Sequence, residues 1–542
     1  MIKILVEESV RYDRSLAWRI HDAYFEQRGV RAWLAGEIPF LSTSNAAVAR
    51  QHATFLAAHV EGLRERGLIG ETFELLEVGG GAGTFAAHVV RALDAQLAPE
   101  LAARLRYLFT DVSARTLREA IEGPELRELV AAGRVVPALY DARETARLRT
   151  LDGAPLGARP VALVANYLCC VMPTRFFRKQ GGEWRELYVS LSTELDDPEA
   201  AEAAAVDREA AVASWLADAT RAGLQERLAL APEWRAVELT GALGAQHREI
   251  LERHTAHVEA ATVTFPQSFF EFLAGARPLL APGGLVLMTD YGHLAGARHE
   301  GATSPRLYGN SLNHAVDFLL VERFAEAARW SIMRTAHPLS SLHTLVLYAG
   351  GAPERTRAAF DAAYVQRTDG QDLLDFSDAA RASLKRDKPA QAVRHLERCI
   401  ALDPEHAGFH HRLGEAYLAA GLPEQALAWL DRGAALDRWR VHDFDLLRGR
   451  ACAEQRQLTE AAAWLRDSIA RKPSPEALLR LGQVLEALGE LHEAVRAYRG
   501  ALALEPEHEE AQARCDRLKD LWWEQLLADL DAPVEPERDR ER

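Results

Sequence analysis

The first two-thirds of the chain alternates short runs of β-branched and other apolar residues with longer stretches typical of helices. Continuous apolar runs of this kind predict strands that are buried on both faces. Strands that alternate with helices predict a parallel sheet covered by helices on both sides. The predicted strands are Phe73–Gly80, Leu105–Ser113, Gly133–Asp141, Arg159–Leu168 and Gly283–Gly292, followed by a final pair at Trp330–Thr335 and His343–Gly350.

Three segments of this part of the chain depart from the alternation. Residues 1–70 precede the first predicted strand, and we expect them to form a helical region. A stretch rich in alanine and glutamate, about 193–262, separates the fourth and fifth strands and predicts inserted helices. Residues 351–372 follow the last strand and are expected to form a linker. The predicted α/β domain therefore covers residues 71–350.

The last third of the chain repeats itself at a period close to 34 residues. Pro404 and Pro506 lie 102 residues apart, which is three periods, and Gly414 and Gly482 lie 68 apart, which is two. Small residues permit two helices to approach closely, and a proline ends the second helix of a pair. This pattern resembles the tetratricopeptide repeat (TPR). Further small residues follow at spacings of 34, 35 and 33, at Ala392, Ala426, Ala461 and Ala494.

The resemblance to the TPR implies a solenoid of stacked helix pairs. We count four repeats from about Phe376 to Pro506, and a capping helix completes a repeat domain at residues 373–529. The charged tail, residues 530–542, is predicted to be disordered. Stacked helix pairs build a concave surface that commonly binds another chain. The repeats therefore predict a protein or peptide partner.

Composition narrows the functional classes that remain. The 542 residues carry a net charge of −15, and this charge with a pI of about 5.7 argues against a nucleic-acid partner. No apolar stretch is long enough to cross a bilayer and the N-terminus does not resemble a signal peptide, so we expect no membrane partner. Five cysteines in a chain this long form no disulfide framework. We therefore expect a cytoplasmic protein, and we assign no metal site.

A glycine-rich loop follows the first predicted strand of the α/β domain. The sequence LLEVGGGAGTF, Leu75–Phe85, places four glycines in five positions. A loop of this kind between a strand and a helix is the ligand-binding turn of a doubly wound fold, because glycines let the backbone approach a ligand. Residues 81–86 match the pattern G-x-G-x-x-G/A, which leaves a dinucleotide as one ligand. The other frame places an acid before alternating glycines, at Glu77, Gly79, Gly81 and Gly83.

The acid followed by alternating glycines resembles motif I of the class I S-adenosyl-L-methionine (SAM) methyltransferases, whose fold is Rossmann-like. SAM carries an ammonium and a sulfonium, so a carboxylate at the strand end favours SAM and repels a pyrophosphate. Asp111 ends the second predicted strand, where a carboxylate can accept hydrogen bonds from ribose hydroxyls. Asp141 ends the third, where it can accept a hydrogen bond from the adenine amine. The predicted SAM-binding residues are Glu77, Gly79, Gly81, Gly83, Asp111 and Asp141.

A second resemblance lies in the sequence LVANYLCCVMP, Leu163–Pro173. This sequence is similar to the pattern Ala-Asn-Glu-x-x-Asp-Ala-x-Pro of the MidA-type methyltransferases. These are relatives of the mitochondrial complex I assembly methyltransferase, which acts on a protein arginine. The similarity covers roughly Phe73–Tyr348 without the inserted helices. It extends to the family's Asp-Tyr-Gly, here residues 290–292, and to the segments 181–189 and 311–318.

The family's two acids after the fourth strand are absent from this sequence. Tyr167 and Cys170 stand where the family has its glutamate and aspartate. A carboxylate pair suits a guanidinium, so its replacement leaves the SAM site intact but disfavours arginine as the methyl acceptor. By the resemblance, the acceptor-facing residues are expected to be Asn166, Tyr167, Asp290 and Tyr291.

These observations lead to one main functional hypothesis and three alternatives. The main hypothesis is a SAM-dependent methyltransferase that modifies a protein, or an acceptor carried by a protein, which the repeats dock. One alternative is a scaffold that keeps the methyltransferase fold without activity, which the missing acids favour. Another is a small-molecule methyltransferase whose repeats serve assembly. A nicotinamide-dependent oxidoreductase is the last, and the acid before the glycines argues against it.

Overall fold

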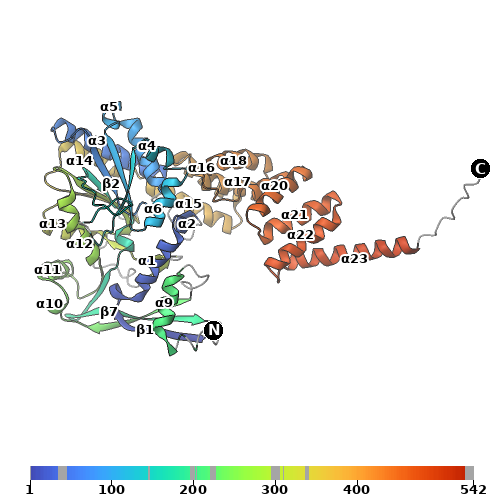
Figure 1. The fold of residues 1–542 in the computed structure, drawn as a ribbon, viewed down its shortest axis with the longest axis horizontal. Helices are drawn as coiled ribbons and strands as arrows, with labels where there is room; N and C mark the ends of the chain where they lie inside the picture. The colour runs from blue at the N-terminus through green and yellow to red at the C-terminus, as the bar shows by residue number, and fades with distance from the viewer. Residues whose placement is uncertain are drawn as a thin grey trace, which may run out of the picture. The chain divides into compact units, whose positions relative to one another are not determined.

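The computed structural model describes residues 2–34, 45–144, 147–195, 202, 204, 206–219, 227–294, 306–308, 311–335 and 341–531. It divides into two compact units, Met1–Leu374 and Asp375–Arg542. The first unit is a mixed α/β domain and the second consists of helices (Figure 1). The predicted architecture, an α/β domain with a mostly parallel sheet followed by a region of helices, is confirmed.

An eight-stranded sheet forms the centre of the first unit (Figure 1). Its main path runs β14-β15-β10-β5-β2-β3-β4, and β13 pairs with β10. The pairs that join β10, β5, β2, β3 and β4 are all parallel, whereas β15 is antiparallel to both of its neighbours. The strands are β2 (Phe73–Glu77), β3 (Leu105–Asp111), β4 (Val135–Leu139), β5 (Ala162–Val164), β10 (Leu285–His293), β13 (Val316–Asp317), β14 (Ser331–Arg334) and β15 (Leu342–Tyr348).

The order of the strands locates the ligand site. The chain runs from β2 outward to β3 and β4, and then returns to the other side of β2 to form β5 and β10. In doubly wound sheets a ligand lies in the crevice at the carboxyl ends of the two strands where the order reverses. Here those strands are β2 and β5, so the glycine loop after β2 and the turn after β5 lie side by side at the same edge of the sheet.

Helices cover both faces of this sheet. On one face, α12 (Gln267–Ala276) and α13 (Phe318–Ala327) share a core with β2, β5 and β10, and the rings of Phe270 and Phe324 stack at 4.3 Å. On the other face, α3 (Ala46–Glu65) packs against α4 (Thr84–Gln96), and its His59 Nε2 lies 3.1 Å from the carbonyl oxygen of Val161. The shorter helices α5 (Pro99–Ala102), α6 (Ala114–Glu122) and α7 (Arg127–Ala131) lie between β2 and β4 in the sequence.

The expectation of inserted helices at 193–262 is wrong in part, because this segment contributes to a second sheet. The second sheet is antiparallel, in the order β1-β7-β6-β9, and β8 also pairs with β7. Its strands are β1 (Ile2–Arg11), β6 (Arg175–Gln180), β7 (Glu183–Leu195), β8 (Leu228–Ala236) and β9 (Ala260–Phe265). The helices of the segment are α9 (Arg208–Ala217), α10 (Leu239–Ala242) and α11 (Ala245–His254).

The physical reason for this error is tertiary context. β8 lies along β7 for nine residue pairs, and those backbone hydrogen bonds outweigh the helix preference of its alanines and glutamate. The same sheet corrects the expectation of a helical region at 1–70, since that region begins with the ten-residue strand β1. The helices that follow are α1 (Leu16–Arg28), α2 (Arg31–Leu34) and α3. A two-stranded ribbon, β11 (Arg306–Tyr308) with β12 (Ser311–Asn313), lies between β10 and β13 in the sequence.

Residues 351–372 pack into the first unit and are no free linker, which also corrects the sequence expectation. They form α14 (Glu354–Phe360), a π-helical turn at Asp361–Val365 and the start of α15 (Asp369–Lys385). Phe360 and Tyr364 are buried, and their rings lie 6.0 and 5.9 Å from the ring of Phe55 on α3. The apolar face of this short helical segment therefore completes the outer side of α3.

The second unit contains the four predicted helix pairs. The first pair is α15 and α16 (Pro389–Leu402), and α23 (Glu509–Asp531) follows the fourth. Ala392, Ala426, Ala461 and Ala494 are fully buried. A side chain at Gly414 would overlap Leu430, so this glycine permits close packing of the two helices of one repeat. The remaining helices are α17 (Ala407–Ala419), α18 (Pro423–Leu436), α19 (Phe444–Glu454), α20 (Leu458–Arg471), α21 (Pro475–Leu488) and α22 (Leu491–Leu504).

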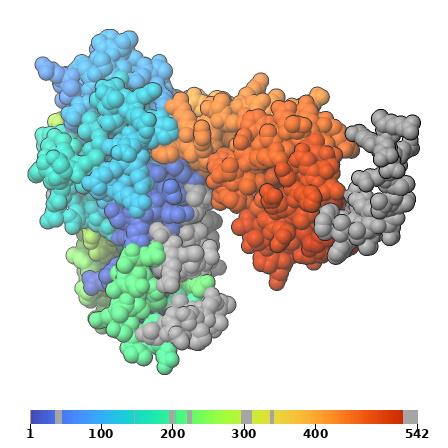
Figure 2. All heavy atoms as spheres, turned by 45° about the vertical axis from the view of Figure 1, so that its right-hand side comes forward, coloured from blue at the N-terminus to red at the C-terminus, as the bar shows by residue number. Residues whose placement is uncertain are grey.

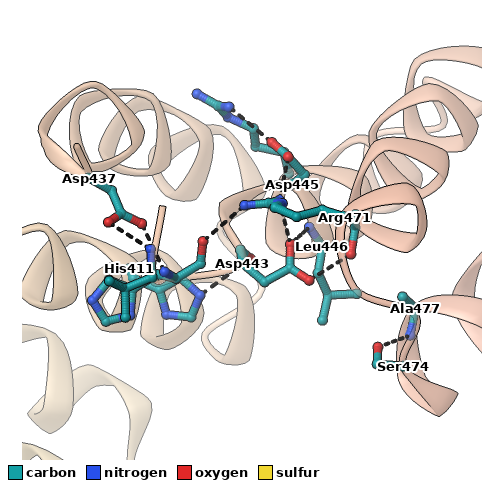
Figure 3. Close-up of polar contacts among 12 residues, drawn as sticks. His411, Asp437, Asp443, Asp445, Leu446, Arg471, Ser474 and Ala477 are labelled. Atoms are coloured by element: carbon teal, nitrogen blue, oxygen red, sulfur yellow. Dashed lines mark hydrogen bonds and ion pairs between the residues drawn. The ribbon is translucent and has the colours of Figure 1, made fainter. Parts of the chain in front are cut away.

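A polar network joins the second and third repeats around Asp443, the N-cap of α19 (Figure 3). Its carboxylate accepts hydrogen bonds from the Leu446 backbone N–H at 3.1 Å, from Ser468 Oγ at 2.6 Å and from Arg471 Nη2 at 3.1 Å. Its carbonyl oxygen lies 3.4 Å from His411 Nε2 on α17. The network fixes the start of α19 against its neighbours, so these polar side chains are explained by packing between repeats.

Two negative observations concern the described residues alone. No helix in this part of the chain is long and apolar enough to cross a membrane. No group of three or more His, Cys, Asp or Glu side chains is arranged there to hold a metal ion. The tail that was predicted to be disordered, residues 530–542, begins inside α23, which ends at Asp531, and its remaining residues lie outside the described residues.

Candidate functional site

The glycine loop leaves β2 at Glu77 and enters α4 at Thr84. Gly79, Gly81 and Gly83 have backbone φ angles of +71°, +55° and +77°, which residues other than glycine rarely adopt. The Gly80 N–H donates to the Thr110 carbonyl oxygen at 2.8 Å, which ties the loop to the end of β3. Gly83 is the N-cap of α4 in the left-handed conformation. The three alternating glycines of the predicted motif therefore carry the backbone conformation on which the tight turn depends.

Asp111, on the neighbouring strand, accepts a hydrogen bond from the glycine loop. It ends β3 and is buried, with an exposed fraction of 5%. Its Oδ2 accepts a hydrogen bond from the Gly81 N–H at 3.2 Å, and its Oδ1 accepts one from the Ser113 N–H at 2.9 Å. A carboxylate oxygen can accept more than one hydrogen bond, so both atoms retain acceptor capacity for hydroxyl groups of a ligand. Burial raises the pKa of Asp111 to about 6.

Glu77 lies at the carboxyl end of β2, beside Asp111. It is also buried, with an exposed fraction of 5%, and its Oε2 accepts a hydrogen bond from the hydroxyl of Tyr107 at 3.2 Å. Burial raises the pKa of Glu77 to about 8, and the negative charge of Asp111 adds to the shift. Among the described residues, no lysine or arginine forms a hydrogen bond or ion pair with either carboxylate. A cationic ligand at this loop would supply the missing charge, whereas an anionic one would be repelled.

Replacing Asp111 with asparagine is expected to weaken the binding of SAM. The asparagine oxygen can still accept one backbone N–H, so the loop keeps a partner, but the charge and one acceptor oxygen are lost. A hydrogen bond to a charged group is worth about 1.5–3 kcal/mol, which corresponds to a loss of roughly 10- to 150-fold in affinity. Calorimetric titration measures the effect. An unchanged dissociation constant in the folded Asp111→Asn chain would show that Asp111 only shapes the loop.

Cofactor binding is also expected to release protons. With a pKa of about 8, Glu77 is mostly protonated at pH 7 in the free protein, while Asp111, at about 6, is mostly ionised. A bound cation favours the ionised carboxylates, so the affinity for SAM should rise as the pH increases from about 6 to 8. Titrations at pH 7 in two buffers of different ionisation enthalpy should therefore give different apparent enthalpies. Equal enthalpies would mean that neither carboxylate changes its protonation.

Asp141 follows β4 and is engaged by an arginine. Arg143 Nε lies 3.0 Å from its Oδ1 and Arg143 Nη2 lies 3.0 Å from its Oδ2. The remaining nitrogen, Nη1, donates to Asp22 on α1 at 2.6 Å. Asp141 therefore lies at the carboxyl edge where the sequence placed it, and it also anchors α1 through Arg143. Its predicted contact with an adenine amine remains a proposal.

Asn166, in the turn after β5, holds its amide in one orientation. Its Oδ1 accepts a hydrogen bond from the Thr289 backbone N–H at 3.2 Å, and His52 Nε2 lies 3.1 Å from the same oxygen. The backbone donor identifies this atom as the oxygen, so His52 Nε2 must donate. Burial lowers the pKa of His52 to about 4, so its ring is neutral at pH 7. The other amide atom, Asn166 Nδ2, is buried and has no hydrogen-bond partner in the described structure, which leaves a fixed donor in the turn after β5.

Tyr167 and Tyr291 form an aromatic pair beside Asn166. Their ring centroids lie 5.1 Å apart at an interplanar angle of 88°. Tyr167 has a φ of +51°, which costs a non-glycine residue free energy, and its backbone N–H donates to the Thr289 carbonyl oxygen at 2.9 Å. A strained conformation that two strands hold in place is common in turns that position functional groups.

Asp290 holds this turn through hydrogen bonds to its backbone. It is fully buried within β10, where its Oδ2 accepts a hydrogen bond from the Cys170 N–H at 3.1 Å and its Oδ1 accepts one from the Tyr291 N–H at 2.8 Å. Burial raises the pKa of Asp290 to about 7. Cys170 is itself buried, and burial with the nearby Asp290 carboxyl raises the pKa of its thiol. The structure thus gives Asp290 a positioning role in the turn that carries Asn166 and Tyr167.

The comparisons with protein families identify the class of protein. A family model described as "Putative S-adenosyl-L-methionine-dependent methyltransferase" matches residues 48–321, which is 274 of the 542 residues. The chain belongs to this family, and SAM is the cofactor of the family. Three tetratricopeptide repeat models match residues 383–440, 433–475 and 475–515. The predicted combination of a SAM-dependent methyltransferase domain with TPR repeats is confirmed.

Solved structures resemble each part of the chain. An uncharacterized protein from Burkholderia thailandensis is 16% identical, with a TM-score of 0.40, over 66% of this chain and 91% of that one. A likely methyl transferase from the same organism, bound to S-adenosyl-homocysteine, is 17% identical with a TM-score of 0.35, over 57% of this chain and 80% of that one. A thermophilic TPR protein of Thermus thermophilus is 23% identical with a TM-score of 0.25, over 30% and 89%. No curated protein matches the sequence.

Several residues of the site carry no signal in the sequence. Tyr107, His52 and Thr289 come from β3, α3 and β10, and each meets its partner only in the folded sheet. His52 lies 114 residues before Asn166, with no motif around it.

Proposed function

We propose that the chain transfers a methyl group from SAM to an acceptor on, or carried by, a protein that its repeats dock. The main support for this proposal is the pair of buried carboxylates, Glu77 and Asp111. They lie beside a loop whose glycines have positive φ angles, at the point where the strand order reverses. Neither carboxylate has a cation of the protein as partner within the described residues. A cationic cofactor fits this site better than a dinucleotide, which disfavours an oxidoreductase.

The cofactor side of the proposal keeps the residues that the sequence motif selects. SAM supplies a methyl group on a sulfonium that is already activated for displacement by a lone pair of the acceptor, with S-adenosylhomocysteine as the other product. The chain holds the cofactor, excludes water from it and orients the acceptor, which accounts for most of the catalysis that this chemistry requires. The proposed cofactor-binding residues are Glu77, Gly79, Gly81, Gly83, Asp111 and Asp141.

The acceptor side of the proposal is the turn after β5. Asn166 presents its fixed Nδ2 donor, and Tyr167 with Tyr291 presents an aromatic surface. The buried Asp290 keeps the turn in place through the Cys170 N–H. This arrangement supplies one hydrogen-bond donor and an aromatic surface but no carboxylate pair, so it suits an amine, amide or hydroxyl acceptor better than a guanidinium.

The methyl acceptor is accordingly expected not to be an arginine gripped at this turn. A guanidinium brought here would lose water without gaining a carboxylate, at a cost of several kcal/mol. Mass spectrometry of partners modified by the protein should therefore find the methyl group elsewhere than on arginine. Methylarginine that the unaltered chain forms and a Tyr167→Ala chain does not would contradict this expectation. A Cys170→Asp change is no suitable probe, because it would place a second carboxyl beside the buried Asp290.

The repeats are proposed to dock the protein that bears the acceptor. Stacked helix pairs present a continuous concave surface, and such surfaces commonly bind peptides or proteins. All five cysteines are free and buried, which is consistent with the reducing cytoplasm as the place of the reaction. A catalytically silent scaffold is the second candidate, and the observation in its favour is that Tyr167 and Cys170 replace the acids of the resembling family.

Transfer of labelled methyl from SAM distinguishes these candidates. The full chain is incubated with labelled SAM and a cell extract, beside a Gly81→Val chain as the control without cofactor binding. Label on a protein that depends on the unaltered chain supports the proposal. Label only on small molecules favours a small-molecule methyltransferase. A chain that binds SAM but labels nothing in any extract that contains its partners favours the scaffold.

A further inference from the structure

The helices α1 and α2 lie at the carboxyl ends of β3 and β4, outside the segment that the family model matches. Two contacts anchor them there. Arg143 bridges Asp22 of α1 to Asp141 after β4. Between α1 and α2, the Val30 N–H donates to Glu119 Oε2 of α6 at 3.0 Å. Figure 2 shows this N-terminal surface, in dark blue, beside the lighter blue surface of the chain that follows β2.

The turn between α1 and α2 is built for this placement. Gly29 has a φ of +57°, and a side chain there would overlap the Glu119 carboxylate. Glu119 is held in turn by Arg115, whose Nε lies 2.8 Å from its Oε1. The segment is therefore fixed against α6, close to the strand ends where the cofactor site lies.

Trp33 of α2 meets the glycine loop directly. A β-carbon built on Gly81 would lie 2.9 Å from Trp33 Cε2 and 3.2 Å from its Cζ2, so the indole covers the side of Gly81 that a side chain would occupy. The ring of Phe25 supports the indole, with centroids 5.3 Å apart. The N–H of the same glycine donates to Asp111. The indole and the Asp111 carboxylate therefore contact one residue of the loop from two directions.

One acidic side chain of this segment fits the same ligand. The negative charge of Glu26, on α1, raises the pKa of Asp111 in addition to burial. An aromatic surface and a further negative charge at the loop are both suited to a cation that carries apolar groups.

We propose that Trp33 is a cofactor-binding residue whose indole forms the wall of the SAM site beside Gly81. The inference rests on the proposed function of that site. It extends the site to a segment that precedes the family-matched residues, and it gives α1 and α2 a role in cofactor binding. The indole offers an apolar, aromatic surface, so its contact with the cofactor is expected to be shared by SAM and S-adenosylhomocysteine.

Calorimetric titration of the full chain with S-adenosylhomocysteine tests the inference. Trp33→Ala is expected to weaken binding about tenfold, as loss of an aromatic contact does, and Trp33→Phe by no more than about threefold. If the alanine variant does not fold, Trp33→Leu replaces it in the test. Trp33→Leu keeps apolar bulk without an aromatic ring and should also weaken binding. Trp234→Ala is the matched control, because Trp234 packs under Arg178 on the second sheet. The Trp234→Ala chain should bind S-adenosylhomocysteine as the unaltered chain does.

The outcomes separate this inference from the proposed function. Folded Trp33 variants that bind S-adenosylhomocysteine as the unaltered chain does would overturn the inference and leave the cofactor site intact. Tighter binding by Trp33→Ala would also overturn it, since the indole would then block the site. An unaltered, folded chain that binds no S-adenosylhomocysteine would overturn the proposed function itself, and the inference with it.

Discussion

A Gly81→Val chain is expected to bind neither SAM nor S-adenosylhomocysteine at measurable concentrations while it keeps its fold. Gly81 has a φ of +55°, and the branched side chain of valine is strained there by about 1–3 kcal/mol. The new side chain would also press on the indole of Trp33 and move the backbone N–H of residue 81, which donates a hydrogen bond to Asp111. The strain is smaller than the stability of a typical domain, about 5–15 kcal/mol, so the loss should fall on the site.

A matched control separates backbone strain from the loss of the site. Gly133, in the turn before β4, has a φ of +68° and no atom within 4 Å of a built β-carbon. Gly133→Val therefore introduces similar strain in open space, and it should bind S-adenosylhomocysteine normally. Circular dichroism and thermal unfolding confirm that both variants fold. If Gly81→Val bound the cofactor as Gly133→Val does, the glycine loop would not be the cofactor site.

A fragment that ends at Gly350 is expected not to fold. It lacks Phe360 and Tyr364, which are buried and pack against Phe55 of α3. Removing one buried aromatic side chain costs about 3–5 kcal/mol, and removal of both approaches the entire stability of a typical domain. A fragment of residues 1–388 keeps this helical segment and all of α15, and we expect it to fold and to bind S-adenosylhomocysteine with the affinity of the full chain.

Thermal unfolding and calorimetric titration of the two fragments check this expectation. The same comparison tests the role of the repeats, because the 1–388 fragment should bind the cofactor but lose methylation of a docked protein. A fragment of residues 1–350 that unfolds cooperatively and binds the cofactor would contradict the packing described for α14. A soluble 1–388 fragment that binds no cofactor would mean that the repeats contribute to the cofactor site.

The sequence predicts the sheet and the loop well because both have strong local signals. Each strand of the large sheet that was predicted from an apolar run is present, and the three alternating glycines have positive φ angles. Glycine adopts positive φ more readily than any other residue, which suits Gly79, Gly81 and Gly83 to this turn. The TPR helices are equally clear, because small residues recur at the period of the repeat.

The errors arise where pairing across the fold decides the structure. β8 has the alanines and the glutamate of a helix, and only its long neighbour β7 makes it a strand. The segment that was expected to be a linker, 351–372, is short and contains polar residues, but it presents Phe360 and Tyr364 to α3. Likewise, no local pattern links His52 with Asn166 or Trp33 with Gly81, since these contacts exist only after the sheet and its covering helices assemble.

The most direct test of the account is a calorimetric titration of the full chain with SAM, S-adenosylhomocysteine and NAD⁺ under one set of conditions. Within the described residues, Glu77 and Asp111 have no lysine or arginine partner beside the glycine loop, and this predicts that SAM and S-adenosylhomocysteine bind and that NAD⁺ does not. Saturable binding of NAD⁺ without binding of SAM or S-adenosylhomocysteine would contradict the account, because the glycine loop would then hold a pyrophosphate in spite of its acids.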